Sequence, residues 1–113
     1  MHCLDITENC KVNSHKYFSM DLTDLSEISR LDERYDMVFH CAGSPSVPNS
    51  VKHPLDDFSV NVKGALNILD FVRLSGCKKF IFLSLVVSIL HVAVYVVPNE
   101  EGFESIGELL FII

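Results

Sequence analysis

The feature that most constrains the fold is the alternation of two kinds of segment along the chain. Short β-prone runs at residues 2–6, 16–20 and 37–40, and a fourth that begins at Phe80, are separated by segments whose apolar residues recur every three or four positions. Strands that alternate with helices form a parallel sheet covered by helices. The pattern therefore predicts an α/β fold, and 113 residues leave room for one small domain with one core.

Two of the intervening segments have the pattern of helices. The first opens after Thr23, a suitable N-cap, and ends near Arg34. Residues 43–50 contain a glycine and two prolines, which predict an irregular loop at the carboxyl end of a strand, where open α/β sheets bind ligands. The second helix runs from Pro54 to a stop at Gly76, with an apolar stripe formed by Leu55, Phe58, Val62, Ala65, Leu66, Leu69 and Val72.

Composition excludes several kinds of function. A net charge of -6, a pI near 5.2 and only nine Lys and Arg residues argue against a nucleic-acid partner, because phosphate binding needs clustered cations. Cysteines at Cys3, Cys10, Cys41 and Cys77 lack the spacing of a zinc site, so we predict no metal and reduced thiols. No apolar run follows Met1, so no secretory signal is predicted and a cytoplasmic location is expected.

Residues 80–97 carry no formal charge, and two interpretations stay open for them. Their length is at the lower limit for a membrane-spanning helix, and the lysines before them would face the cytoplasm. They are also rich in β-branched residues and include Ser84, Ser88 and His91, which suits buried strands equally well. We favour the strands, so a membrane partner is not expected.

Three motifs keep their order and approximate spacing across residues 21–84. They are the run VFHCAG at 38–43, the run NVKGALNIL at 61–69 and the run KFIFLS at 79–84. Together they resemble the NAD-dependent sugar-nucleotide epimerase/dehydratase family, an extended branch of the short-chain dehydrogenase/reductase superfamily. The resemblance implies an incomplete Rossmann-like, doubly wound parallel sheet, an NAD cofactor and a nucleotide-sugar substrate.

The resemblance also implies a set of cofactor-binding residues. Asp5 matches the strand-end acid that accepts hydrogen bonds from ribose hydroxyls, which favours NAD over NADP. Asp21 matches the acid that receives the adenine amino group, with the backbone of Leu22 facing the ring. From the residues alone, Asp5 could equally be a surface acid and Asp21 could open a turn before the next helix.

The strand-end run and the helix add the remaining candidates. His40, Cys41, Ala42 and Gly43 end a predicted strand, and the small Ala42 and Gly43 would let a cofactor approach the backbone. The resemblance gives Asn61 a hydrogen bond to the backbone near the active site. By themselves, His40 could be a core histidine, the small residues a tight turn, and Asn61 a solvent-facing residue.

The sequence departs from the family in three ways. No Gly-x-x-Gly-x-x-Gly turn precedes Leu4, so we expect the first strand of the sheet and its phosphate-binding turn to be missing. Ser84 matches a strand-end serine and is the one catalytic candidate, but Leu85 stands where a second hydroxyl is expected. No Tyr-x-x-x-Lys pair is present, because no Lys follows Lys79 and no Tyr follows Tyr95.

These features divide the chain and its possible functions. We expect a partial NAD-binding domain at residues 1–84 and a divergent hydrophobic tail at residues 85–113. The leading hypothesis is a fragment of an NAD-dependent sugar-nucleotide epimerase or dehydratase that is inactive as an isolated chain. The alternatives are a non-catalytic binding module that forms a homodimer, and a protein anchored in a membrane through residues 80–97.

Overall fold

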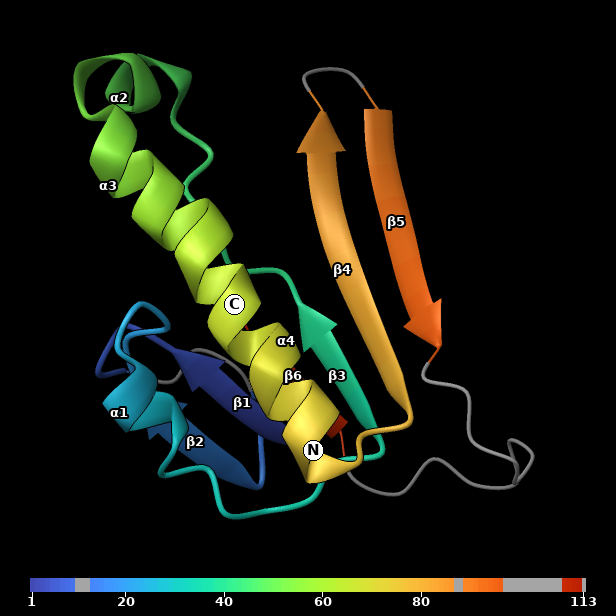
Figure 1. Ribbon diagram of the computed structural model, residues 1–113. Helices are drawn as coiled ribbons and strands as arrows, with labels where there is room; N and C mark the ends of the chain where they lie inside the picture. The colour runs from blue at the N-terminus through green and yellow to red at the C-terminus, as the bar shows by residue number, and fades with distance from the viewer. Residues whose placement is uncertain (10–12, 87–88, 97–108, 113) are drawn as a thin grey trace.

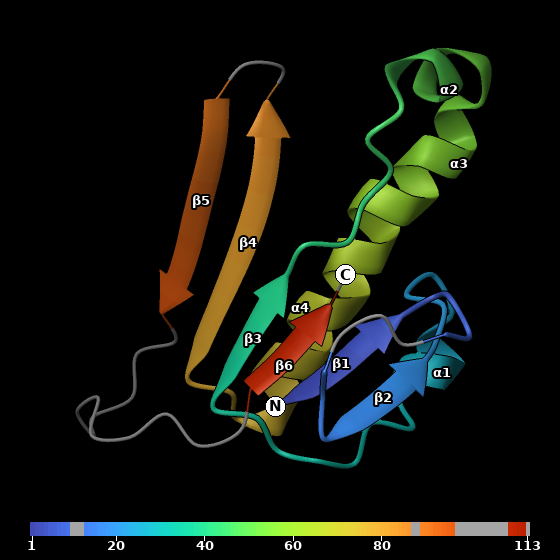
Figure 2. The same cartoon turned by 180° about the vertical axis from the view of Figure 1, so that it is seen from behind.

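The computed structural model describes residues 1–9, 13–86, 89–96 and 109–112, which form a twisted sheet with helices on one face (Figures 1 and 2). The strands and helices, in chain order, are β1 His2–Asp5, β2 Lys16–Ser19, α1 Leu25–Ile28, β3 Met37–His40, α2 Val47–Lys52, α3 Pro54–Phe58, the π-helix η1 Ser59–Lys63, α4 Gly64–Ser75, β4 Lys79–Val86, β5 Ile89–Val96 and β6 Leu109–Ile112. All four predicted strands are confirmed, and each predicted start or end lies within one residue of the observed one.

The sheet has the strand order β2-β1-β6-β3-β4-β5. Every pair of neighbours is parallel except β4 and β5, which are antiparallel. Two of the connections between strands contain helices, since α1 lies between β2 and β3 in the chain and α2 to α4 lie between β3 and β4, as in nucleotide-binding α/β folds. This arrangement confirms the predicted partial Rossmann-like α/β fold.

The strand β6 lies in the middle of the sheet although it comes from the far end of the sequence. It pairs in parallel with β1 on one side and with β3 on the other. Figure 2 shows it between these two strands. The β4–β5 hairpin and β6 therefore belong to the same sheet as β1, β2 and β3.

Residues 80–97 do not form the membrane-spanning helix that was one of the open interpretations. Most of them belong to the β4–β5 hairpin, in which Lys79 pairs with Val96 and Val86 pairs with Ile89. β-branched side chains favour this extended conformation. Over the ranges that the structure describes, no helix has the length and apolar character needed to cross a bilayer.

The first helix is shorter than predicted and has a different cap. Asp24, not Thr23, is the N-cap, and its carboxylate accepts the backbone N–H of Ser26 at 2.9 Å. Thr23 instead donates its own N–H and hydroxyl to Asp21. The α-helix ends at Ile28 rather than near Arg34.

The segment predicted as an irregular loop is also partly helical. Val47–Lys52 forms α2, and Ser46 caps it by accepting the backbone N–H of Asn49 at 3.3 Å. Pro48 lies in the first turn, where the missing N–H would have no partner in the helix. The two prolines therefore lie at the start of a helix instead of excluding one, Pro45 before the cap and Pro48 in the first turn.

The predicted long helix divides into α3, η1 and α4, and its buried face is only partly the predicted stripe. Ile68 and Val72 are buried, whereas Leu55, Phe58 and Leu66 are 80%, 56% and 58% exposed. Figure 1 shows the reason, since α3 extends beyond the edge of the sheet and only α4 lies across it. Gly76 ends α4 as predicted, with a left-handed φ of 73° that favours glycine.

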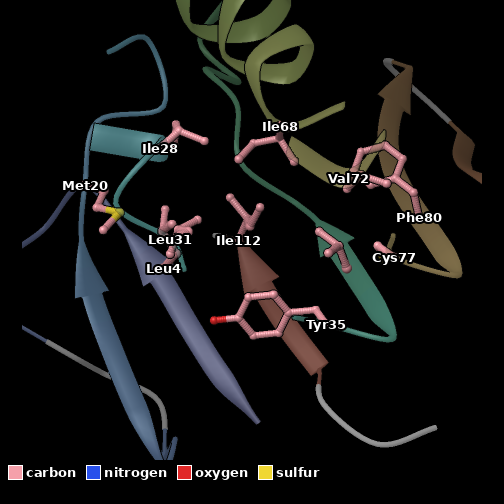
Figure 3. Packing of buried hydrophobic residues seen from close by; sticks show 11 residues of the cluster. Leu4, Met20, Ile28, Leu31, Tyr35, Ile68, Val72, Cys77, Phe80 and Ile112 are labelled. Carbon is pink, nitrogen blue, oxygen red and sulfur yellow. The ribbon is translucent and has the colours of Figure 1, made fainter. Parts of the chain in front are cut away.

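The core fills the space between the sheet and the helices α1 and α4. Figure 3 shows Ile112 of β6 directed toward Ile68 of α4, with Leu4 and Leu31 on one side and Phe80 on the other. All five side chains are at most 6% exposed. The sheet and its crossover helices are thus fixed relative to one another beneath the carboxyl edge.

Candidate functional site

The carboxyl edge of the sheet carries two adjoining cavities. The larger, of about 400 Å³, is lined by Cys41, Ala42, Gly43, Ser44, Pro45, Asn61, Phe82 and Leu83. The smaller, of about 230 Å³, is lined by Leu4, Asp5, Ile6, Met20, Asp21, Leu22, Thr23, Ala42, Gly43 and Val60. Ala42 and Gly43 line both, so the segment that leaves β3 separates two halves of one cleft. We call this pair of cavities the edge cleft.

Asn61 holds the segment that follows β3 in place. Its Oδ1 accepts the backbone N–H of Ser44 at 2.8 Å, and its Nδ2 donates to the Ser44 carbonyl at 3.4 Å. Gly43 has to be small for the same reason, because a Cβ there would lie 2.8 Å from Asn61 Oδ1. The glycine thus admits the amide of Asn61 beside the backbone, a use that its sequence position alone did not reveal.

The π-helix η1 places Asn61 at this position. Residues 59–63 make wider turns than an α-helix, which locally shifts the direction of side chains, and such turns occur often at functional sites. The predicted continuous α-helix would have given Asn61 a different phase relative to α4. The side chain faces the backbone of residue 44 and bonds to it through both atoms of its amide.

The two candidate acids of the first strands converge on the smaller cavity. The Asp5 carboxylate accepts the Thr7 hydroxyl at 2.9 Å and the Thr7 N–H at 3.4 Å. Asp21 Oδ1 accepts both the N–H and the hydroxyl of Thr23 at 2.8 Å. These bonds orient both carboxylates before any ligand arrives. Within the described residues, no hydrogen-bond donor contacts Asp21 Oδ2, so this oxygen can accept a hydrogen bond from a ligand.

Two residues that the sequence reasoning did not single out support the loop around Leu22. Asn67 of α4 donates its Nδ2 to the Leu22 carbonyl at 2.7 Å. Gly64 lets the loop approach the helix, since a Cβ at residue 64 would lie 3.2 Å from the Leu22 Cβ. Both belong to the 61–69 motif, and their spacing of three residues places them on one helix face. That spacing was the signal that could have identified them.

His40 and Cys41 occupy different environments although they are adjacent. The His40 ring is 1% exposed and stacks against both Phe80 and Phe82, with centroid distances of 6.0 and 5.3 Å. Burial lowers the pKa of His40 to about 4, so the ring is neutral at neutral pH. Cys41 lines the larger cavity, and burial raises the pKa of its thiol.

Within the described residues, His40 lies beneath the edge cleft rather than in its wall. Its closest ring neighbour, Phe82, does line the larger cavity. The backbone of Ser84, the catalytic candidate, pairs with His91 in the β4–β5 hairpin. The Ser84 side chain lies outside the described part of the structure.

Comparison with known proteins gives one consistent family. The sequence profile of the NAD dependent epimerase/dehydratase family matches residues 4–87. UDP-glucose 4-epimerase of Homo sapiens is 34% identical over 73 residues, which cover 63% of this chain and 21% of the human protein. CDP-paratose 2-epimerase of Salmonella typhi is 38% identical over 55 residues, which cover 47% of this chain and 16% of that protein.

Solved structures agree with the sequence matches. A crystal structure of UDP-glucose 4-epimerase superposes with a TM-score of 0.63 and 26% identity, covering 72% of this chain and 26% of the other. The chain spans about a fifth of the length of the human relative. The matched residues 4–87 include Asp5, Asp21, the segment after β3 and Asn61, all of which line the edge cleft.

Proposed function

Because this chain belongs to the NAD-dependent epimerase/dehydratase family, we propose that its edge cleft binds the nicotinamide dinucleotide NAD. The observation that carries the proposal is the convergence of Asp5, Asp21 and the Ala42–Gly43 segment on one cavity. Residues 2–5 and 16–19 are neighbouring parallel strands, so their carboxyl ends meet at the same edge. The proposed ligand fits the chemistry of this group of residues.

The smaller cavity suits the adenosine half of the cofactor. The Asp5 carboxylate would accept hydrogen bonds from ribose hydroxyls, and Asp21 Oδ2 would accept one from the adenine amino group. The backbone of Leu22, held by Asn67, would face the ring. A phosphate on the ribose would be repelled by Asp5, so the cavity favours NAD over NADP.

The larger cavity would take the nicotinamide half beside the segment that Asn61 holds. When bound, the nicotinamide supplies a reversible hydride acceptor for oxidation at a sugar carbon. Ala42 and Gly43 leave the backbone accessible between the two halves of the cleft. Cys41 stays a protonated thiol at neutral pH, because burial raises its pKa further.

Substitution of Asp21 tests the adenosine site. In Asp21→Asn, the side-chain oxygen is needed by the Thr23 N–H and hydroxyl, so the amide nitrogen would face the cleft. The amide N–H groups of the introduced asparagine would then face the N–H groups of the adenine amino group, and neither can accept a hydrogen bond from the other. We expect NAD affinity, measured by calorimetry, to fall by about 10- to 100-fold, as for loss of a charge-assisted hydrogen bond.

Asp32→Asn is the matched control, because Asp32 is exposed and lies outside both cavities. It should bind NAD with unchanged affinity, and the unsubstituted chain should prefer NAD to NADP. Equal weakening by both substitutions, or no NAD binding by the unsubstituted chain, would count against the proposed site.

For catalysis, we propose that this chain is a part of a longer protein that acts on a nucleotide-sugar, and that these 113 residues alone do not catalyse the reaction. In the family, a lysine lowers the pKa of a tyrosine that takes the proton from the sugar hydroxyl. No Tyr-x-x-x-Lys pair occurs in this sequence. When the purified chain is incubated with NAD and UDP-glucose, chromatography should detect no UDP-galactose. A UDP-glucose 4-epimerase assayed in parallel should form it. Product formation by the chain would refute this.

A homodimer is a second proposal, and one surface feature favours it. Exposed apolar side chains form a stripe along α3, η1 and α4, comprising Leu55, Phe58, Val62, Leu66 and Leu69. Such a stripe is stabilised by pairing with a similar face of a second copy. We expect light scattering to give a dimer mass that Leu55→Lys with Leu66→Lys reduces to a monomer mass.

Leu25→Lys provides the control for the dimer, because Leu25 is 57% exposed but lies on α1. This variant should keep the dimer mass. A monomeric unsubstituted chain at all concentrations tested would exclude the homodimer.

A further inference from the structure

The position between β1 and β3, which we call the central slot, is filled by a strand from the opposite end of the chain. Leu110 is the partner of His2 on β1, and Phe111 is the partner of Cys3. On the other side, the same strand pairs with residues 37–40 of β3. Since β1 and β3 do not pair with each other, β6 supplies all the backbone ladder bonds between the two halves of the sheet.

The strand also completes the hydrophobic core. Ile112 is 0% exposed and belongs to the cluster that contains Leu4, Val38 and Ile68. Figure 3 shows its side chain entering the centre of that cluster, below α4. If β6 left the slot, the core would lose a fully buried side chain and two strands would expose unpaired edges.

One hydrogen bond connects the slot to the edge cleft. The N–H of Cys41 donates to the carbonyl of Ile112 at 2.7 Å, immediately beyond the last residue of β3. The next residues, Ala42 and Gly43, line both cavities. The backbone that separates the two halves of the cleft is therefore anchored at one end by β6 and at the other by Asn61.

From these contacts we propose that the central slot is a strand-acceptor site, that Leu109–Ile112 is its internal occupant, and that occupancy orders the edge cleft. The site accepts an extended apolar segment in parallel register with both neighbours, and recognises it through backbone bonds and the pocket for residue 112. Its effect on nucleotide binding rests on the proposed function, whereas insertion of the strand does not.

Disulfide formation tests the insertion without any nucleotide. In Phe111→Cys, the new thiol is in register with Cys3, and partners in adjacent strands lie within the range that a disulfide spans. Mild oxidation should give an intramolecular disulfide between Cys3 and the thiol introduced at position 111, mapped by mass spectrometry. Leu110→Cys is the matched control, because its partner is His2 and successive residues of a strand face opposite sides. Its introduced thiol should form little disulfide with Cys3.

Two results would overturn the assignment of β6 as internal occupant. One is equal crosslinking of Phe111→Cys and Leu110→Cys, which would mean that the strand has no fixed register. The other is a disulfide between Cys3 and position 111 that is found only between two chains, which would assign the slot to a strand from a second copy.

Opening the slot tests its role as an acceptor. Leu110→Pro removes a backbone N–H in the middle of the ladder, so β6 should leave the slot. A fluorescein-labelled peptide with the sequence of residues 107–113 and a lysine tag should then bind this variant at least tenfold more tightly than the unsubstituted chain. A scrambled peptide should bind neither. Equal peptide binding to both proteins would contradict the acceptor site.

The final measurement separates this proposal from the proposed function. If occupancy orders the cleft, Leu110→Pro should lower NAD affinity at least tenfold, and the peptide should restore it. Unchanged NAD affinity in an opened slot would overturn the coupling to the cleft. If the unsubstituted chain binds no NAD, the proposed function fails, while the disulfide and peptide measurements still decide whether the strand occupies the slot.

Discussion

Replacing Ile68 by alanine should lower the free energy of unfolding by about 2–5 kcal/mol. Ile68 is 0% exposed on α4 and packs into the cluster between the helix and the sheet. The substitution removes buried methyl groups and leaves a space that neighbouring side chains fill only partly. Because small domains are stable by only about 5–15 kcal/mol, a loss of this size removes a large part of the total.

Leu74→Ala serves as the control for Ile68→Ala. Leu74 lies on the same helix but is 69% exposed, so its truncation should change the stability by less than about 1 kcal/mol. Urea unfolding followed by circular dichroism would give both values. Similar losses for the two variants would show that α4 does not pack on the sheet through the face described above.

The second large effect is a loss of stability in mild acid that depends on His40. The folded protein has a His40 pKa of about 4, against an ordinary value of 6.5, because burial beside Phe80 and Phe82 disfavours the charged ring. Between these two pH values the unfolded chain binds a proton that the folded chain does not. Stability must therefore fall as the pH falls from 6.5 toward about 4, and the contribution of His40 levels off below that.

The magnitude follows from the difference between the two pKa values and is about 3 kcal/mol. The variant His40→Phe keeps an aromatic ring in the stack but cannot be protonated. Urea unfolding at a series of pH values should show the stability of this variant rising relative to that of the unsubstituted chain as the pH is lowered. A constant difference between the two proteins across this range would mean that His40 is not kept neutral by the fold.

Local sequence patterns predicted the regular elements well where they depend on neighbouring residues. The strand at residues 37–40 follows from the β-prone residues Val38 and Phe39, and the stop at Gly76 follows from a left-handed φ that favours glycine. The cap at Asp24 and the helix after Ser46 were missed, because both depend on which of several polar side chains accepts a given backbone N–H. Adjacent candidates such as Thr23 and Asp24 look equivalent in the sequence.

The apolar stripe of residues 55–72 shows the limit of periodicity. The pattern predicted one amphipathic helix, but it could not show that α3 extends past the sheet or that η1 changes the phase of the side chains. Residues such as Leu55 and Leu66 are apolar and exposed, since no element of the described structure covers them. Which apolar face is buried depends on the partner surface, and that surface is made by distant parts of the chain.

By itself, the sequence determined the alternation of strands and helices, the family motifs and the residues gathered at the ends of strands, because these depend on the order and spacing of nearby side chains. Only the tertiary structure decided that Asn61 reaches the backbone at residue 44, that Asn67 supports the loop at Leu22, and that β6 lies between β1 and β3. These contacts join residues that are far apart in the chain, and no local pattern specifies them. Their geometry follows from how the sheet and α4 bury a shared core.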